Sequence, residues 1–226
     1  MLGDPVTEPV RTLDGSPPDP QAPKEVVKSV DTTVHSFQPC LQENIVVIDL
    51  GQSFDVNALP KDYEAGTTMT HFSPESRFDN IVTTASDIWG LACTIFEIRA
   101  GRPLFNSFMV SHSTILCETV FSLGKLPDPW WGKFEGRDEW FEENGQPKPP
   151  DEMISIRQLL EGIGAEDTPT MDNDGPMIEP VGTRLKEEEI VLLADLLEKM
   201  LKYRPEERIT IQDVVRHPWF GYISTE

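Results

Sequence analysis

The chain has 226 residues, of which 38% are apolar, and a formal net charge of −20. This length favours one domain with a single sizeable core. The negative charge repels other polyanions, so nucleic acid is excluded as a direct partner. There is no long apolar run, which argues against a signal peptide or membrane anchor and predicts a soluble protein of the cytoplasm or nucleus.

The N-terminal segment, from Met1 to about Thr33, is rich in proline and poor in large apolar residues. Proline fixes its own backbone and donates no hydrogen bond, so this composition predicts an extended linker and not an element of the core. The prolines concerned are Pro5, Pro9, Pro17, Pro18, Pro20 and Pro23.

A short β-branched run at residues 44–48 ends at Asp49. This pattern predicts a buried strand that brings a carboxylate to its C-terminal end. Gly51 then permits a sharp turn. On its own, such a segment is also compatible with an ordinary turn after a strand.

A long apolar helix is predicted from Thr84. Thr84 and Asp87 have the spacing of a capping box, and Gly101 and Pro103 end the pattern. A helix with almost no polar face belongs at the centre of a domain. Its apolar residues are Ile88, Trp89, Leu91, Ala92, Cys93, Ile95, Phe96 and Ile98.

The cysteines and tryptophans are expected to be structural. The chain has three cysteines, Cys40, Cys93 and Cys117, an odd number without C-x-x-C spacing, which favours free buried thiols over a disulfide or a metal site. Three tryptophans stand among prolines and a glycine and are expected to pack the core and not to form a ligand cage. They are Trp130, Trp131 and Trp140.

The negative charge is concentrated between Asp138 and Glu189. This stretch holds fifteen acidic residues against four basic ones, a net charge of −11. It would attract a basic peptide. A solvated insertion whose charge serves only solubility is the alternative.

Two further helices are predicted near the C-terminus. One runs from about Glu187 to Leu201, and Pro205 cannot continue it. Its expected inner face consists of Ile190, Leu193, Leu197, Met200 and Leu201. The other begins at Thr210, with Asp213 three residues later, and ends at His217-Pro218.

Four strings in this order resemble the second half of a eukaryotic serine/threonine protein kinase. They are Asp49-Leu50-Gly51 in place of D-F-G, Ser73-Pro74-Glu75 in place of A-P-E, Asp87-Ile88-Trp89, and Arg204-Pro205-Glu206-Glu207-Arg208. Asp49-Leu50-Gly51, together with Asp87-Ile88-Trp89 followed by Ala92-Cys93, is similar to the SR-protein kinase family and its fungal relatives. In those relatives a stretch like Leu2–Val10 lies in an insertion between the catalytic loop and the D-F-G.

The resemblance implies a mainly α fold of the α+β kinase family. The expected architecture is a helical large lobe with a short β element around Asp49. No glycine-rich loop, V-A-I-K lysine or catalytic loop can be identified before Asp49, so the small lobe is expected to be absent. Residues 1–40 are then a proline-rich linker or family insertion, and residues 41–226 a partial kinase domain.

The resemblance also implies roles for individual residues. Asp49 would hold Mg²⁺ against the phosphates of ATP, with Gly51 beside the cofactor, and Thr68 in the activation segment would face the substrate. Glu75 and Arg208 would form a buried structural ion pair. Asp87 would tie its helix to the catalytic loop or simply cap the helix, and Trp89 would belong to the core. The catalytic-loop Asp is absent, so no catalytic residue is assigned.

Two functions from different classes follow. The first is an SR-protein-kinase-like enzyme that phosphorylates protein serine and threonine with ATP and acts in regulating mRNA processing, this chain being a truncated large lobe expected to be inactive alone. Its partners would be protein substrates, including Arg/Ser-rich basic segments, without nucleic acid or membrane. The second is a non-catalytic, pseudokinase-like interaction module that binds basic partners through an acidic face. Thr67, Thr68 and Thr70 are candidate phosphorylation sites, with unmodified loop residues as the alternative.

Overall fold

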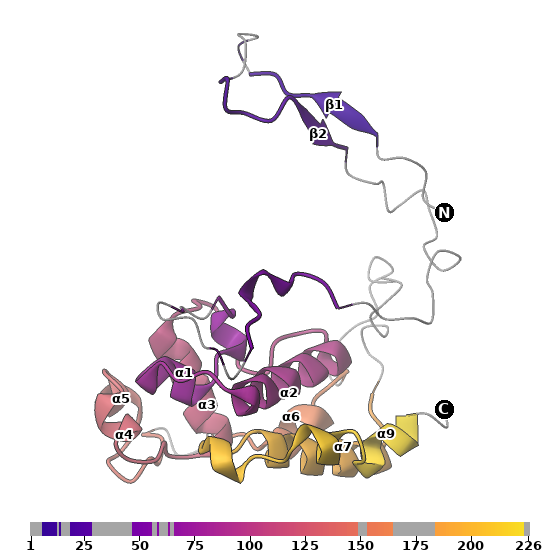
Figure 1. Cartoon of the computed structure of the whole chain (residues 1–226). Coiled ribbons are helices and arrows are strands. Elements are labelled where there is room, and N and C mark those ends of the chain that lie inside the picture. The colour runs from indigo at the N-terminus through magenta and orange to yellow at the C-terminus, as the bar shows by residue number, and fades with distance from the viewer. Residues whose placement is uncertain are drawn as a thin grey trace. The chain divides into compact units, whose positions relative to one another are not determined.

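The computed structural model describes residues 6–12, 14, 19–28, 47–55, 58, 63, 66–148, 153–164 and 184–223. The chain divides into two compact units, Met1–Ile48 and Asp49–Glu226 (Figure 1). Cys40 and the first three residues of the strand predicted at 44–48 lie outside the described residues. So do seven of the fifteen acidic residues between Asp138 and Glu189.

The N-terminal unit contains a small antiparallel hairpin. Strand β1 (Thr7–Pro9) pairs with β2 (Glu25–Val27), and Thr7 lies opposite Val27. Every residue of both strands is exposed, and Lys28 contacts Glu8 at 3.3 Å across the pair. None of the described residues of this segment is buried, as the proline content predicts, but the strand pairing was not predicted. Two strands without a packed face are marginally stable at best.

The predicted buried strand before Asp49 is wrong for the residues that can be checked. Val47 and Ile48 are 77% and 78% exposed and lie in no strand. A strand needs a neighbour for its backbone hydrogen bonds, and in the described residues no strand pairs with these two. The chain instead enters a short 3₁₀ helix, η2 (Leu50–Gln52).

The second unit is built mainly from helices around α2 (Thr84–Ala100). Before α2 come the 3₁₀ helix η3 (Met69–His71) and α1 (Pro74–Asp79). After α2 the chain forms α3 (His112–Leu123), α4 (Trp130–Lys133), α5 (Arg137–Trp140), α6 (Ile156–Glu161), α7 (Glu187–Met200), η4 (Pro205–Glu207), α8 (Ile211–Val214) and α9 (Pro218–Ile223). The predicted helical fold is therefore present in the described residues.

The N-cap of helix α2 lies one residue earlier than predicted. Thr83, with an extended backbone, accepts a hydrogen bond from the Ala85 amide, and the Ser86 hydroxyl accepts one from the Thr83 amide. The capping box is thus Thr83 with Ser86 and not Thr84 with Asp87, because only Thr83 has the backbone conformation of a cap. Gly101, with φ of 68°, ends the helix as predicted.

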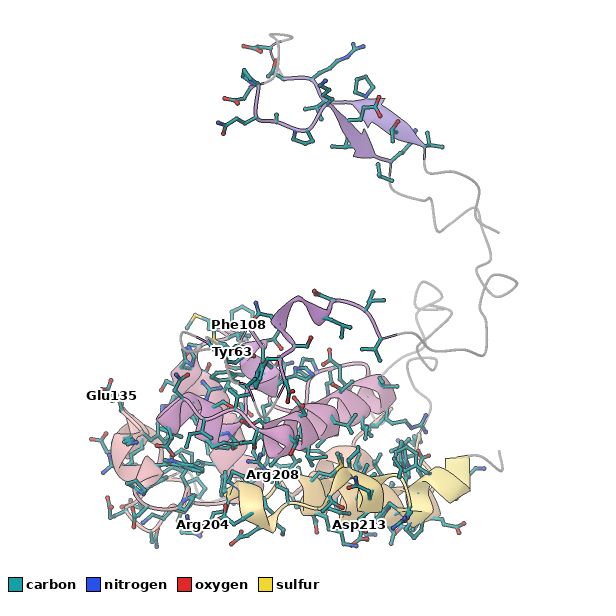
Figure 2. The ribbon with its side chains drawn as sticks, in the orientation of Figure 1. Tyr63, Phe108, Glu135, Arg204, Arg208 and Asp213 are labelled. Atoms are coloured by element: carbon teal, nitrogen blue, oxygen red, sulfur yellow. The ribbon has the colours of Figure 1, made fainter. Side chains whose placement is uncertain are left out.

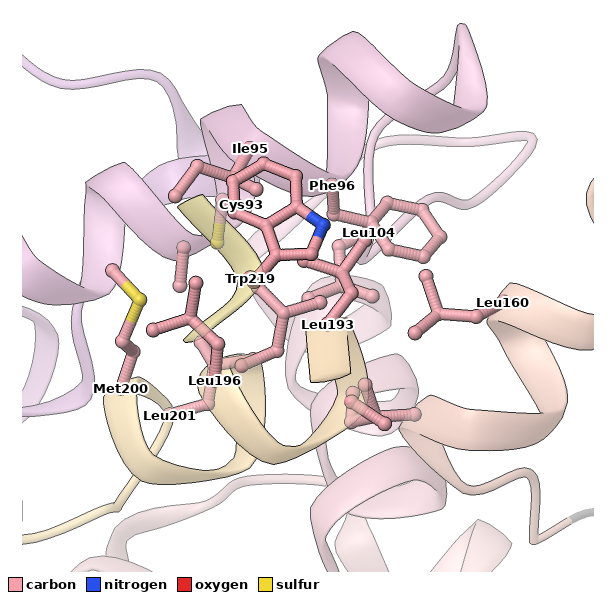
Figure 3. Close-up of a cluster of buried hydrophobic side chains, with 14 of the residues drawn as sticks. Cys93, Ile95, Phe96, Leu104, Leu160, Leu193, Leu196, Met200, Leu201 and Trp219 are labelled. Atoms are coloured by element: carbon pink, nitrogen blue, oxygen red, sulfur yellow. The ribbon is translucent and has the colours of Figure 1, made fainter. Parts of the chain in front are cut away.

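The core lies where α2 meets the C-terminal helices (Figure 3). The predicted inner face of α7 is fully buried, and Trp89 is 1% exposed. Side chains of the cluster come from α2, α6, α7, α9 and the adjoining turns, including Cys93, Ile95, Phe96, Leu104, Leu160, Leu193, Leu196, Met200, Leu201 and Trp219. Removing this much apolar surface from water is the main favourable term for folding the unit.

The predictions for the described thiols and for two of the tryptophans are confirmed, and the prediction for the third tryptophan is wrong. Cys93 and Cys117 are free and buried, and burial raises the pKa of Cys117 to about 11 and that of Cys93 further, so both thiols are inert at neutral pH. Trp130 and Trp131 pack in a second apolar cluster beneath α3 and α4. Trp140 is 44% exposed, so the prediction that it packs in the core is wrong.

The C-terminal helices also differ in detail. Thr210 caps α8 by accepting a hydrogen bond from the Asp213 amide, as predicted. The helix ends at Val214, however, and Pro218 begins α9. Proline is favoured in the first turn of a helix, where its missing N–H has no partner to lose. Among the described residues no helix is long and apolar enough to cross a membrane.

Candidate functional site

A polar cavity of about 460 Å³ lies beside the N-terminal half of α2. Gln52 and Tyr63 line it from the residues before η3, Thr68 and His71 from the cap and the end of η3, and Asp87 from α2. Figure 2 shows Tyr63 above α2 and Arg208 below it in that view. Many of the remaining lining residues are serines and threonines, which supply hydroxyl groups to walls that also expose apolar surface.

Asp49 lies at the start of η2 with a left-handed backbone, φ 60° and ψ 55°. Its side chain is exposed, and it does not line the cavity. The segment positions the carboxylate through the turn at Gly51, whose Cα faces an Asp49 oxygen: a Cβ built there would lie 3.7 Å from Oδ1. Asp49 is one of the few residue types that tolerate this backbone conformation.

The described residues supply too few ligands for a metal ion by themselves. No group of three or more histidine, cysteine or acidic side chains comes together among them. A carboxylate such as that of Asp49 has the chemistry Mg²⁺ prefers, and Mg²⁺ commonly takes one or two carboxylates together with substrate phosphates and water. The carboxylate fits the ion, but the described residues alone do not complete a site.

Thr68 is exposed and belongs to a small hydrogen-bonded cluster. Its hydroxyl lies 3.1 Å from His71 Nδ1, and the Thr70 hydroxyl lies 3.0 Å from the same nitrogen. On the other side of the ring, His71 Nε2 lies 3.2 Å from the Glu97 carboxylate of α2. The cluster therefore fixes the end of the activation segment to the central helix. The role of Glu97 was not predicted from the sequence. The only available signal was an acidic residue within the largely apolar helix α2.

Asp87 projects from the first turn of α2 toward the cavity. Its carboxylate is exposed and makes no hydrogen bond or ion pair with any other described residue. Partial desolvation raises the pKa of Asp87 above its ordinary value. Because Thr83 and Ser86 make the capping box, Asp87 is not the cap, and the capping alternative for this residue is wrong.

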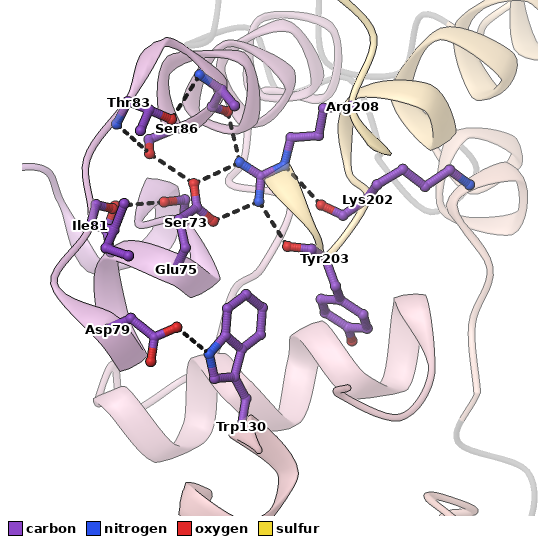
Figure 4. A network of polar contacts seen from close by, with 12 residues as sticks. Ser73, Glu75, Asp79, Ile81, Thr83, Ser86, Trp130, Lys202, Tyr203 and Arg208 are labelled. Atoms are coloured by element: carbon purple, nitrogen blue, oxygen red, sulfur yellow. Dashed lines mark hydrogen bonds and ion pairs between the residues drawn. The ribbon is translucent and has the colours of Figure 1, made fainter. Parts of the chain in front are cut away.

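Glu75 and Arg208 form a bidentate ion pair buried between α1 and the segment after η4 (Figure 4). Arg208 donates to the two Glu75 oxygens at 2.8 and 2.7 Å, and the Ser86 hydroxyl donates to Glu75 at 2.7 Å. The side chains of both partners are almost completely buried. The pair that the sequence predicts is therefore present.

The remaining donors of Arg208 are also used. They bond to the carbonyls of Lys202, Tyr203 and Ala85, and the guanidinium lies over the Trp89 ring at 5.1 Å from its centre. Burial by itself would raise the pKa of Glu75, but the hydrogen bonds and charge of Arg208 outweigh it and hold that pKa below its usual value. Such complete pairing satisfies what a buried charge requires.

The sequence model of the protein kinase domain family matches residues 40–220 of this chain. The chain belongs to the protein kinase family. Among its curated relatives are extracellular signal-regulated kinase 1 of Candida albicans, 28% identical over 139 residues, and serine/threonine-protein kinase SRPK of Physarum polycephalum, 29% identical over 145 residues. Each alignment covers 61% of this chain and 30% of the relative.

A third relative of this kinase-family chain is the dual specificity protein kinase CLK2 of Mus musculus. It is 25% identical over 147 residues, which are 62% of this chain and 25% of the relative. The alignments thus span less than a third of the length of each of these three relatives. Their identities to this chain are similar, so they support the family without selecting one subfamily.

Proposed function

We propose that this chain is the large-lobe part of a serine/threonine protein kinase which, in its complete form, transfers the γ-phosphate of ATP to protein hydroxyls. The observation that carries the proposal is the Glu75–Arg208 pair, which joins the end of the activation segment to the C-terminal helices with both charges satisfied. The match to the kinase domain supports it independently. Phosphoryl transfer depends on positioning, and this framework holds the activation segment in place.

In that complete form Asp49 would be a ligand of Mg²⁺. The ion, when bound, neutralises charge on the nucleotide phosphates. The part of the chain described here contributes the carboxylate, its turn and the Thr68 cluster, whereas the groups that hold the nucleotide and orient the attacking hydroxyl have no counterpart that can be identified in the sequence. We expect the 226-residue chain alone to transfer no phosphate.

We further propose that the substrates are Arg/Ser-rich protein segments, as the resemblance to SR-protein kinases implies, and that the protein acts on mRNA processing in the cytoplasm or nucleus. The net charge of −20 supports attraction of basic segments. Some acidic residues between 138 and 189 are less able to attract a basic segment, because they are already paired. Glu189 is buried against Arg99, whereas Glu161 and Glu187 both pair with Arg157.

A transfer assay tests the catalytic proposal. The chain would be expressed together with the in-frame coding sequence upstream of it, and incorporation of labelled γ-phosphate into an Arg/Ser-rich peptide would be measured. We expect transfer by this longer protein, loss of transfer with Asp49→Ala, and none with the 226-residue chain. If the upstream sequence has no catalytic-loop H-x-D-x-x-x-x-N string and the longer protein is inactive, the catalytic proposal is refuted.

The alternative function is a non-catalytic module that binds basic partners. The exposed carboxylate of Asp87, which has no partner among the described residues, and the excess of acidic residues favour it. Binding of an Arg/Ser-rich peptide to the 226-residue chain, measured by isothermal titration at low and high salt, tests it. Affinity should fall as salt rises, because exposed charges are screened. An affinity independent of salt contradicts this function.

A further inference from the structure

A single arginine beside the activation segment lacks an acidic partner. Arg77, on α1, makes no ion pair with any described residue, although the chain has 39 acidic residues against 19 lysines and arginines. Its guanidinium donates to the Met69 carbonyl of η3 at 3.1 Å and to Nδ1 of His112 at the start of α3. It also lies 5.5 Å from the centre of the Phe72 ring. Contacts with Met69, Phe72 and His112 thus hold the Arg77 guanidinium in place.

The carboxylates nearest to Arg77 in the chain are engaged elsewhere. Glu75 is bound by Arg208, and Asp79 accepts hydrogen bonds from Lys133 at 2.8 Å and from the Trp130 indole at 2.6 Å. Across η3, Glu97 pairs with His71. Each of these three described carboxylates therefore already has a partner, and none of them pairs with Arg77.

The guanidinium retains binding capacity. An arginine carries five N–H donors, and the two printed bonds of Arg77 use two of them, which leaves three without a partner among the described residues. Partial burial lowers the pKa of Arg77 to about 10, because desolvation disfavours the charged guanidinium. An anion bound there would receive charge-assisted hydrogen bonds from a fork of fixed geometry.

We propose that Arg77, oriented by His112 and the Met69 carbonyl, is a binding site for a phosphoryl monoester. A phosphoryl group carries a charge of about −1.5 to −2 and three acceptor oxygens, which match the unused donors better than a carboxylate with one charge. Two sources supply this chemistry: a phosphorylated residue of a bound peptide, or a phosphorylated threonine of the adjoining segment, such as Thr68 or Thr70. This site is separate from Asp49 and does not depend on kinase activity.

Nuclear magnetic resonance of the full chain labelled with ¹⁵N-arginine tests the site. The Nε–Hε signal of Arg77 is assigned from its loss in Arg77→Lys, and the probes are N-acetyl-phosphothreonine amide, its unphosphorylated form and acetate at constant ionic strength. The signal should shift saturably with the phosphorylated probe, with an affinity at least about tenfold higher than for acetate, and should not respond to the neutral form.

The variants decide whether Arg77 is the receptor. Because the variants of residue 77 lack the Arg77 signal, their affinity for the phosphorylated probe is measured by isothermal titration. This affinity should fall at least about tenfold in Arg77→Gln and several-fold in Arg77→Lys, which keeps the charge and loses the fork, whereas the exposed Arg216→Gln control should bind like wild type. Thermal melts verify that each variant is folded. If Arg77→Lys binds like wild type, or if the Arg77 signal moves no more than that of Arg216, the proposal is overturned.

A second sample identifies the source of the phosphoryl group. Chain carrying phosphothreonine at position 70, and separately at position 68, is compared with unmodified chain. An Arg77 signal that is already shifted and no longer responds to the probe would show that the chain's own threonine fills the site. A signal that still responds with unchanged affinity would assign the site to a peptide ligand. Binding of acetate as tight as that of the phosphorylated probe would overturn the phosphoryl assignment.

Discussion

Residues 49–75, which contain the expected activation segment, are held very differently at their two ends. At the C-terminal end, Glu75 is buried, accepts two bonds from Arg208 and one from Ser86, and stabilises the junction of α1 with the last helices. At the N-terminal end, Asp49 is exposed, as are Val47 and Ile48 before it. The junction at Glu75 is thus well packed and fully hydrogen-bonded, whereas the segment with the expected metal ligand has no packed support among the described residues.

The first way to break this comparison is to remove one partner of the buried pair. Glu75→Ala or Arg208→Ala should each lower the free energy of unfolding by about 3–5 kcal/mol, because the remaining charge would be buried alone. Urea unfolding followed by circular dichroism measures the change. Arg157→Ala, which removes an exposed cation from Glu161 and Glu187, is the control and should unfold like wild type. If Glu75→Ala and Arg208→Ala both unfold at the urea concentration of wild type, the ion pair does not stabilise the fold as expected.

Acid should weaken the framework through Glu75. The folded state lowers the pKa of Glu75 below its ordinary value of 4.5, so the unfolded state binds the proton more readily. The contribution of this carboxylate is present above pH 4.5 and is lost as the pH falls through the lower folded-state pKa. Glu75→Gln should therefore show a shallower loss of stability below that pH than wild type. Parallel pH profiles of the two proteins would count against this linkage.

A smaller effect should separate the true cap of α2 from its neighbour. Thr83→Ala should cost about 1 kcal/mol, because the N-terminal amides of the helix lose an acceptor. Thr84→Ala, one residue later and exposed, should change the free energy of unfolding by less than about 0.5 kcal/mol. Thermal melts of the two variants suffice. A larger effect at Thr84 would return the cap to the position expected from the sequence alone.

The smallest effect is expected at the other end of the activation segment. Ile48→Ser and Asp49→Asn should each alter the free energy of unfolding by no more than about 0.5 kcal/mol, since neither side chain is buried and asparagine, like aspartate, tolerates the left-handed backbone at residue 49. The same urea titration tests both. A loss of 2 kcal/mol or more at Ile48, the range of about 1.5–3 kcal/mol expected for a buried isoleucine, would show that the segment packs in solution and would erase the difference between the two ends.

Much of the fold could be predicted because its signals are local. The apolar pattern from Ile88 to Ile98 and the stop at Gly101 predicted α2, and the period of the apolar residues after Glu187 predicted α7. The Glu75–Arg208 pair could be predicted only through the kinase resemblance, because the two residues are 133 positions apart and no local pattern links them. The cap of α2 was misplaced by one residue because Thr83 and Thr84 differ in backbone conformation and not in chemistry.

The sequence by itself determined α2, α7 and the cap of α8, since helical period, caps and glycine stops act over a few residues. Its four motif strings also indicated the family to which the chain belongs. Only the tertiary structure decided that Val47 and Ile48 stay exposed, that His71 pairs with Glu97, and that Arg77 has no acidic partner among the described residues. Strand pairing and charge compensation depend on which distant residues meet in space. A one-dimensional pattern does not contain that information.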